Sequence, residues 1–441
     1  MNADTALPTP PGGVASAMTE TALPAGLSPG QQPAAGQRRL KQELQRAELR
    51  KKLSALALIA PLAIFLLVVF AVPIGALLQR AVASPEVPNA LPQTVAVLAK
   101  WDRKALPPDA AFGALAADLA VARQGNGAGE LGRRLNNEIS GYRSLITKTS
   151  RAMPVGGDAA QARQALLGID PRWGELPYWQ AIAKNGSRTT PFFLLASLDL
   201  QQDNFGNLQQ APPEGAIYRG IFVRTLWIGA LTTGLALLIA FPLAYWASTL
   251  PARQANLVMI CVLIPFWTSV LVRIAAWVVL LQQSGLVNTG LMAMGITSGP
   301  MALLFNRTGV TISMVHILLP FMILPLYSVM KAIPPTYQRA AISLGSHPFA
   351  AFWRVYVPQT YAGIAAGVLL VFITAIGYYI TPALLGGPGD QMVSYYVAYF
   401  TNQAVNWGMA CALGALLLVA TLVLYAVYQR IVQTNANANI R

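Results

Sequence analysis

Charged residues are scarce in this chain of 441 residues. They make up 11% of it, against about 25% in an ordinary soluble domain. Acidic residues are scarcest in the second half, where Asp390 is the only one that follows Glu214. This composition excludes a soluble fold for most of the chain. Without paired carboxylates or a proton relay beyond residue 220, a proton-coupled transporter or an intramembrane metalloprotease is disfavoured.

Cysteines are few, and nucleotide-binding motifs are absent from the sequence. The two cysteines, Cys261 and Cys411, lie in apolar segments. A thiol behaves there as a small hydrophobe, so we expect neither a disulfide nor a metal site. The pattern G-x-x-x-x-G-K-[ST] does not occur, and neither does any Gly-Lys pair. Because that motif cradles phosphate, we expect this chain to have no catalytic residues and to bind no cofactor.

Long uncharged apolar stretches dominate the sequence instead. A helix that crosses a bilayer needs about 20 such residues. The sequence therefore predicts an all-α integral membrane protein with six transmembrane helices. The predicted spans are 53–80 and, approximately, 222–248, 257–282, 310–331, 361–385 and 408–430.

The remaining segments differ in composition from the spans. Residues 1–36 are rich in Pro, Ala, Gly and Thr, which predicts a disordered tail. A basic, helix-prone run at 37–52 precedes the first span, and a short tail at 433–441 follows the last. The five later spans form a core at 216–432, which includes a polar hairpin at 332–360.

Residues 81–215 read as a soluble insertion between the first and second spans. They hold 13 Lys/Arg and 12 Asp/Glu, so their charge is nearly balanced. The segment "PPDAAFGALAADLAVARQ" repeats apolar residues at spacings of three and four, with Asp109 near its start. Such patterns predict amphipathic helices. We therefore expect a mainly helical, folded insertion.

The net charge of +14 has a distribution that argues against nucleic-acid binding. The excess sits at 37–52 and in short connectors between spans. The positive-inside rule places such connectors in the cytoplasm. We therefore expect both termini and the hairpin to be cytoplasmic, and the insertion to be periplasmic. The basic residues that fit this topology are Arg253, Lys331, Arg339, Arg354 and Arg430.

The hairpin has the sequence "YQRAAISLGSHPFAAFWRVYVPQ" from Tyr337 to Gln359. Gly345 is a natural helix stop, and Pro348 can begin a second helix. Four aromatic residues of that second helix share one face, because they are spaced at i, i+3, i+4 and i+7. Two interpretations remain open. The aromatic face covers the membrane surface, or the first short helix docks into a groove of a soluble partner.

The hairpin resembles the "EAA" loop of bacterial ABC importer permeases. That family has Glu-Ala-Ala, three residues, Gly, nine residues and Ile-x-Leu-Pro. Here Ala340-Ala341, Gly345 and Val355-Tyr356-Val357-Pro358 keep the spacing, and Arg339 stands in place of Glu. The segments "IPFWTSVLVRIAAWVVLLQQSGLVN", "LLPFMILPLYSVMKAI" and "GYYITPALLGGPGDQMV" resemble permeases of the spermidine/putrescine type. The resemblance covers 50–80 and 216–432, and the insertion is longer than the family's corresponding loop.

The resemblance implies a set of partners in the bacterial inner membrane. Such a permease pairs with a second permease, rests on two copies of an ATPase that binds ATP and Mg, and receives a small solute from a periplasmic binding protein. Membrane lipid surrounds the spans. The first helix of the hairpin would lodge in the ATPase. The coupling residues implied are Arg339, Ala340, Ala341, Leu344, Gly345, Phe349, Phe352, Val355 and Pro358.

A few polar and aromatic residues of the core are candidates for a solute pathway. Arg273 is a charge inside a span, where it either serves the pathway or extends to the membrane surface. The aromatic candidates either line the passage or belong to the interfacial belt. His316 reads as a hydrogen-bonded packing residue. The aromatic candidates are Trp267, Tyr378, Tyr379 and Tyr395, with Trp277 and Tyr396 beside them.

These observations favour the permease subunit of a polyamine importer. One alternative is an importer of the same build for another small solute, such as an opine or an amino-acid derivative. A second alternative is a membrane scaffold or receptor that transports nothing and whose insertion binds a partner. Association with an ATPase would separate the transporters from the scaffold.

Overall fold

The computed structural model divides the chain into two units, one ending at Val72 and the other beginning at Pro73. The predicted tail at 1–36 lies outside the described residues except for its last three positions, and the tail at 433–441 lies partly outside them. The described residues are 34–154, 157–203 and 206–438.

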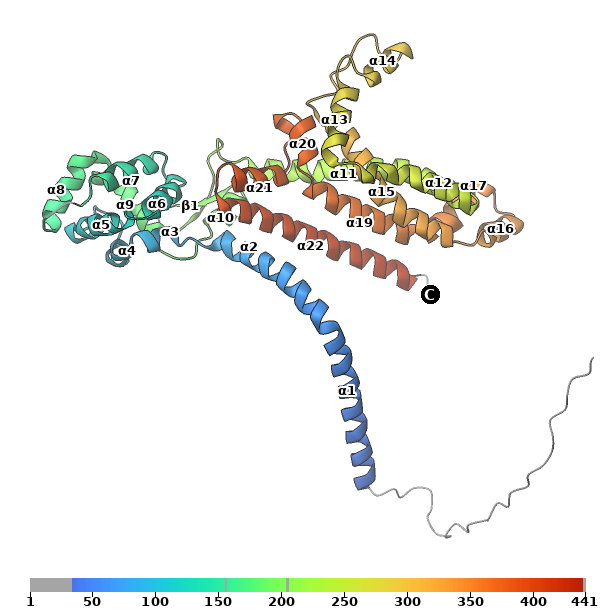
Figure 1. Ribbon diagram of the computed structural model, residues 1–441, viewed down its shortest axis with the longest axis horizontal. Helices are drawn as coiled ribbons and strands as arrows, with labels where there is room; N and C mark the ends of the chain where they lie inside the picture. Colours follow the sequence, from blue (N-terminus) through green and yellow to red (C-terminus); the bar gives the residue numbers. More distant parts are fainter. Residues whose placement is uncertain (1–33, 155–156, 204–205, 439–441) are drawn as a thin grey trace, which may run out of the picture. The chain divides into compact units, whose positions relative to one another are not determined.

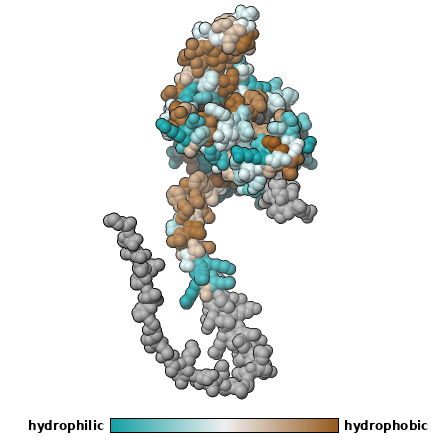
Figure 2. Space-filling view, turned by 90° about the vertical axis from the view of Figure 1, so that its right-hand side faces the viewer, coloured by the Kyte–Doolittle hydropathy of each residue, from teal (hydrophilic) through white to brown (hydrophobic). Residues whose placement is uncertain are grey.

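The first unit is a long helix with an apolar surface. Helix α1 (Ala34–Leu66) continues into a π-helical turn, η1 (Leu67–Ala71). The basic run predicted at 37–52 and the start of the first apolar span therefore belong to one helix. Large apolar side chains are exposed along it (Figure 2). The stretch Arg50–Val82 is long and apolar enough to cross a bilayer, where lipid would cover these side chains.

The second unit begins in α2 (Val72–Val82) and continues into a helical insertion (Figure 1). The described residues of the insertion form eight short α-helices, one 3-10 turn and one antiparallel strand pair, which agrees with the helical character expected from its periodicity. Its elements are α3 (Glu86–Ala90), α4 (Pro92–Leu98), α5 (Asp109–Ala122), α6 (Gly127–Asn136), α7 (Tyr142–Arg151), α8 (Ala159–Ile169), η2 (Pro171–Gly174), α9 (Leu176–Lys184), α10 (Phe192–Ala196), β1 (Leu200–Gln202) and β2 (Leu208–Gln210).

Aromatic side chains fill the core of the insertion. Trp179 packs between Phe112 and Trp173, with ring centroids 4.5 Å and 5.5 Å away, and all three are fully buried. The indole of Trp179 donates a hydrogen bond to the Trp173 carbonyl at 2.9 Å. Large aromatic rings dominate core energetics, and their buried polar atoms need partners. The insertion therefore has a core of its own.

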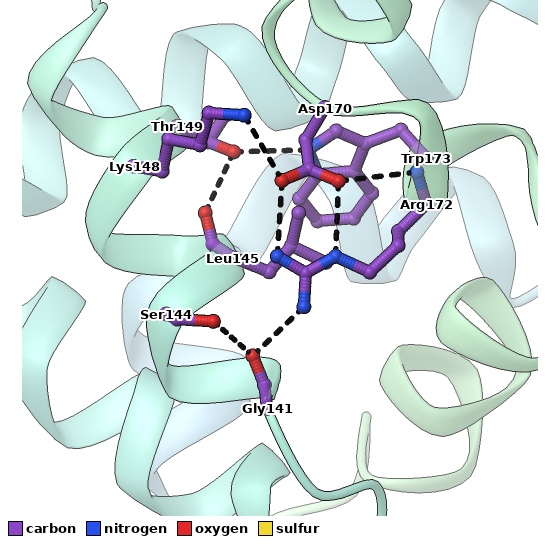
Figure 3. A network of polar contacts seen from close by, with 8 residues as sticks. All are labelled: Gly141, Ser144, Leu145, Lys148, Thr149, Asp170, Arg172 and Trp173. Atoms are coloured by element: carbon purple, nitrogen blue, oxygen red, sulfur yellow. Dashed lines mark hydrogen bonds and ion pairs between the residues drawn. The ribbon is translucent and has the colours of Figure 1, made fainter.

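A polar network fixes η2 against α7 (Figure 3). The Arg172 guanidinium donates to both oxygens of Asp170, each at 2.9 Å, and to the Gly141 carbonyl at 3.1 Å. The ammonium of Lys148 lies 3.3 Å from Asp170. The hydrogen bonds from Arg172 hold the pKa of the buried Asp170 carboxyl well below its usual range. Asp170 is therefore charged, and it stabilises the fold in that form.

We expect Asp170→Asn to destabilise the insertion by roughly 2 kcal/mol. Breaking a buried charge pair costs about 3–5 kcal/mol, and the value is lower here because 27% of the Arg172 side chain is exposed. The urea dependence of hydrogen exchange in α7 of the full chain measures this loss. Because the folded-state pKa of Asp170 is depressed, its stabilisation is present above pH ~4 and is lost at lower pH. The wild type should therefore weaken below pH ~4 more than the variant does.

The matched control for Asp170→Asn is Asp109→Asn. Asp109 lies 2.8 Å from Arg163, but about two-fifths of each side chain is exposed. Surface pairs contribute only about 0–1 kcal/mol. Equal losses of protection in the two variants would contradict the role assigned to the network.

Two contacts join the end of the insertion to the long helices. The carboxylate of the buried Asp199 accepts hydrogen bonds from the backbone N–H groups of Tyr218 and Arg219, at 2.9 Å and 2.8 Å. These two N–H groups lie in the first turn of α11 (Tyr218–Thr249), where a backbone N–H has no acceptor within the helix. The ring of Phe193 on α10 lies where a side chain at Gly408 would stand, because a Cβ there would be 2.4 Å from the ring. Gly408 belongs to α22 (Trp407–Ala438).

Three long helices form the packed centre of the membrane core. Helices α11, α15 (Arg307–Ala332) and α19 (Tyr361–Gly377) lie side by side (Figure 1). Small residues permit the close approach: Ala236, Ala240 and Ala244 are fully buried on one face of α11. On α19, a Cβ at Gly367 would lie 2.7 Å from the sulfur of Met322. Small residues at such interfaces are typical of helices in membranes.

The third predicted span, 257–282, is a broken helix. It comprises α12 (Ala252–Leu263), a 3-10 turn η3 (Ile264–Trp267) and α13 (Val270–Leu281). The break has a local cause, because Pro265 lacks a backbone N–H and Thr268 and Ser269 are extended, with ψ of 147° and 144°. Helix α14 (Leu286–Ala293) follows after a short turn.

The region after α19 is also divided into short elements. Tyr378 is extended and ends α19, so the predicted span at 361–385 comprises α19 and α20 (Ile380–Leu385). A 3-10 turn, η5 (Pro388–Asp390), and α21 (Val393–Asn402) lead to α22. Among the described residues, five helices are long and apolar enough to cross a membrane, or six if a pair bent by 60° at Thr360 is one span.

Candidate coupling hairpin and polar membrane cluster

The first arm of the hairpin is α16 (Thr336–Ser343), which ends in a glycine turn. Gly345 has φ of +92°, a conformation that glycine adopts without strain. The N–H of Ser346 donates to the Ala341 carbonyl at 3.0 Å, and the N–H of Gly345 donates to the Ile342 carbonyl at 2.9 Å. This pair of bonds is the Schellman arrangement, which satisfies the last carbonyls of a helix. The sequence predicted both the helix and its stop.

The second arm consists of three short helical pieces. These are α17 (Pro348–Ala351), a π-helical turn η4 (Phe352–Tyr356) and α18 (Val357–Gln359). The imidazole of His347 accepts a hydrogen bond from the N–H of Phe349 at 3.3 Å and so caps α17. No partner for His347 was predicted, because this hydrogen bond depends on the turn that precedes it.

Aromatic packing anchors the second arm to α11. The ring of Phe352 lies 5.2 Å from that of Tyr245 and 6.4 Å from that of Phe241, both of which belong to α11. Tyr356 packs against Tyr245 at the same distance of 5.2 Å and stacks on Phe352 at 5.6 Å. Such ring pairs contribute about 0.5–1.5 kcal/mol each beyond their area burial. The second arm is therefore fixed to the membrane core.

The first arm, in contrast, presents its surface to solvent. Every residue of α16 is at least partly exposed, and Arg339 and Ala340 are exposed. Leu344 is 90% exposed and Phe349 is 68% exposed. Val355 and Pro358 are half-buried with Phe352. The nine predicted coupling residues thus divide into an outward set around Gly345 and an anchoring set that contacts the core.

The candidate pathway residues do not form a single cluster. Trp267 is 79% exposed on η3, and Tyr379 is 42% exposed beside α20. Tyr395 is half-buried on α21, where its ring packs edge-on against Tyr396 at 5.4 Å. In the isolated chain these rings are available to lipid or to another subunit, and their role in a pathway stays a prediction.

Arg273 belongs to a separate polar cluster between α13, α15 and α19. It interacts electrostatically with His316 on α15 and with Tyr378 at the end of α19. One turn further on α13, the indole of Trp277 donates a hydrogen bond to Nδ1 of His316 at 3.3 Å. The Nε group of Arg273 is buried and has no hydrogen-bond partner within the described part of the chain. His316 is hydrogen-bonded, as expected.

The sequence reasoning missed this cluster as a unit. A signal was present, because Arg273 and Trp277 are four residues apart and therefore share a helix face. The identity of the residue opposite them depends on how α13 packs against α15, which no local pattern encodes.

The lone carboxylate of the core is already paired. Arg307 donates through Nε to Asp390 at 3.1 Å, and Asp390 is 8% exposed. The pair joins the start of α15 to η5 and so ties together the connectors that precede α15 and follow α20. Asp390 therefore serves the structure of these connectors and is not free to bind a cation.

Comparison with known proteins assigns the core to a family. The family described as "Binding-protein-dependent transport system inner membrane component" matches residues 221–436. The permease protein PotB of the spermidine/putrescine transport system of Haemophilus influenzae is 37% identical over 209 residues, which are 47% of this chain and 73% of that protein. PotB of Escherichia coli is 29% identical over 214 residues, covering 48% and 78%.

A solved structure is also similar to part of this chain. It is a bacterial alginate ABC transporter in complex with an alginate pentasaccharide-bound periplasmic protein, at 19% identity and a TM-score of 0.38, covering 48% of this chain and 77% of that chain. Together, the family match and the 37% identical relative establish the assignment. This chain belongs to the family of multi-pass inner-membrane permease subunits of binding-protein-dependent ABC transporters.

Proposed function

We propose that this chain is a permease subunit of a polyamine importer of the spermidine/putrescine type. The solute class is supported by the PotB relative, which is 37% identical over 209 residues. The observation that carries the coupling part of the proposal is the hairpin, in which the Gly345 turn presents α16 while aromatic packing fixes the second arm.

The hairpin geometry suits a mechanical link to a separate ATPase. The small side chains of Ala340 and Ala341 allow a groove of the ATPase to approach the helix backbone closely, and the exposed Leu344 offers an apolar contact. Two copies of the ATPase would supply ATP hydrolysis with Mg, and a second permease would complete the membrane part. A periplasmic binding protein would deliver the solute. Motion of α16 would reach α11 through Phe352 and Tyr245.

This chain is a poor place for a tight polyamine site. An ammonium left unpaired in an apolar site costs several kcal/mol. Asp390, the only acidic residue after Glu214, is paired with Arg307. Aromatic faces such as those of Tyr378 and Tyr379 can still ease passage, since a cation over such a ring gains about 0.5–2 kcal/mol. Discrimination would therefore rest mainly in the binding protein, with the partner permease as the other place for carboxylates.

The test of this function is uptake by the assembled transporter. In cells that lack the chromosomal copy of this chain, labelled spermidine uptake should require the restored chain, an intact ATPase and the binding protein. Uptake that persists when the ATPase is inactivated would exclude an ATP-driven importer, and uptake that does not depend on the restored chain would favour the scaffold alternative. Purified transporter without its binding protein should bind labelled spermidine only weakly. Micromolar binding that disappears when residues of this chain alone are changed would refute the argument from missing carboxylates.

One observation favours a second candidate solute class. The Arg273 cluster places an unpaired guanidinium donor beside Trp277 and His316. This chemistry suits a carboxylate, as an opine or amino-acid derivative would carry. Uptake of such a compound with no uptake of spermidine would decide for this alternative.

We also propose cytoplasmic termini and a periplasmic insertion, and cysteine labelling tests this orientation. Cys261 is exposed and Cys411 is buried, so both are first replaced by serine and alanine. A single cysteine at Ser346 should then stay unlabelled by a membrane-impermeant maleimide added to intact cells. A cysteine at the exposed Ser187 of the insertion is the matched control and should be labelled. The reverse pattern would overturn the topology and the coupling proposal together.

A further inference from the structure

A cleft of about 560 Å³ lies between the insertion and the connection from α21 to α22. On one side it is lined by the end of α2 and by α3 and α6, and on the other by residues 404–408. Helix α2 ends at Val82 and α22 begins at Trp407. Both helices belong to stretches apolar enough to cross a membrane. In a membrane crossed by these two stretches, the cleft would lie at the depth of the lipid headgroups.

The side chains around the cleft are predominantly basic. Four arginines face two glutamates, with asparagine amides between them. Trp407, at the rim, is the first residue of its span, and tryptophan is enriched at this depth of a membrane. The charged residues that line the cleft are Arg80, Arg133, Arg134, Arg143, Glu86 and Glu130.

Arg134 is built into the floor of this cleft. It is 3% exposed and donates to Ser84, Glu138 and Asn185. Its guanidinium also lies over the ring of Phe192, 4.4 Å from the centroid. These contacts leave Nη1 buried, with no hydrogen-bond partner in the described residues. An unpaired buried donor beside a cleft is a place where a ligand or an ordered water can supply the missing acceptor.

Glu86 contributes a buried acceptor, Oε2, that also lacks a hydrogen-bond partner among the described residues. A ligand that satisfied both groups would offer an acceptor to Arg134 and a donor to Glu86. The excess of arginines over glutamates in the lining favours a ligand that carries negative charge. A glycerol-phosphate group has all three properties, because its phosphate accepts and its hydroxyls donate.

We propose that this cleft binds the headgroup of an anionic phospholipid of the phosphatidylglycerol type. The phosphate would accept from Nη1 of Arg134 and lie among the guanidinium groups of Arg133 and Arg143. A glycerol hydroxyl would donate to Glu86, and the acyl chains would leave past Trp407 into the bilayer. Basic pockets beside span ends bind lipid headgroups in this way. The lipid would then join the insertion to the span ends as a structural ligand.

Native mass spectrometry of the purified full-length chain tests this site. Dioleoyl-phosphatidylglycerol and dioleoyl-phosphatidylcholine are titrated separately, and the variant Arg133→Gln/Arg143→Gln removes the two exposed rim arginines. Each basic side chain near an anionic headgroup contributes roughly a factor of five in affinity. The double variant should therefore bind phosphatidylglycerol about twenty-five-fold more weakly. The control Lys100→Gln/Arg151→Gln removes the same charge from exposed positions outside the cleft and should change the affinity less than about twofold.

Three results would overturn the proposal. The first is equal binding of the two lipids, and the second is equal weakening by the cleft and control variants. The third is displacement of the lipid by an equal concentration of free glycerol phosphate, which would assign the cleft to a soluble anion. If the double variant does not fold, Arg133→Gln alone decides, with an expected loss of about fivefold.

Discussion

Replacing Gly345 by valine should lower ATP-driven uptake by at least about tenfold while the chain still inserts into the membrane. Gly345 has φ of +92°, and a β-branched residue held in such a conformation carries a strain of about 1–3 kcal/mol. The neighbourhood is open, since no atom lies within 4 Å of a Cβ placed there. The strain is therefore conformational, and the turn would relax by changing the direction of α16. Uptake and co-purification of the ATPase are the two measurements.

Gly345→Asn is the matched control for this substitution. Asparagine adopts positive φ at much lower cost than valine, and the open space accommodates its side chain equally well. We expect Gly345→Asn to keep at least half of the uptake. Normal uptake by the valine variant, at normal expression, would contradict a role for the turn in coupling. Equal loss in both variants would point to a requirement for a bare backbone at the ATPase surface.

The second large effect is expected from Gly408→Ala. A methyl group there would overlap the Phe193 ring, whose nearest atoms lie 2.4–2.6 Å from the Cβ position. Phe193 is 4% exposed, so it has little room to move. Overpacking of this kind costs about 1–3 kcal/mol, and here the cost falls on the contact between α10 and α22. Hydrogen exchange in α10 should rise about tenfold or more, while exchange in the aromatic core of the insertion should stay unchanged.

A second substitution separates this clash from a general loss of stability. Phe193→Leu removes ring atoms that the new methyl group would meet. The pair Gly408→Ala/Phe193→Leu should therefore restore much of the protection lost in Gly408→Ala. Additive losses in the double variant would show that the two residues do not act through their contact.

The hairpin was predictable because its signals are local. A glycine stop, a proline start and four aromatic residues at helical spacing lie within 23 residues. The glycine and the proline each mark a helix end in the structure, and the aromatic residues lie in α17 and η4. The anchoring role of Phe352 was not readable from the same residues. Its partners Phe241 and Tyr245 lie more than 100 positions earlier in the chain.

The broken third span shows why an apolar run says little about helix continuity. Hydropathy predicts that 257–282 is buried in a membrane, and lipid favours a helix there. Pro265 allowed a break, but prolines at 242, 320 and 325 lie within uninterrupted helices. The extended residues Thr268 and Ser269 decide the outcome, and their conformation depends on neighbours that the sequence does not reveal.

The insertion was predictable in its elements more than in its assembly. Spacing of apolar residues predicted a helix beginning near Asp109, and α5 begins there. The bidentate pairing of Arg172 with Asp170 and the burial of Arg134 arise only when separate helices meet. The cleft between the insertion and α22 has the same origin, since it joins residues more than 250 positions apart.

Helix α11 has a further consequence for how force travels through the protein. It is one uninterrupted helix of 32 residues, which makes it about 48 Å long. The carboxylate of Asp199 in the insertion accepts hydrogen bonds from the first turn of this helix. Near the other end of the helix, Tyr245 packs against the ring of Phe352 in the hairpin's second arm. Because α11 is contacted near both of its ends, a tilt of its first turn would displace the second arm of the hairpin, which packs on Tyr245.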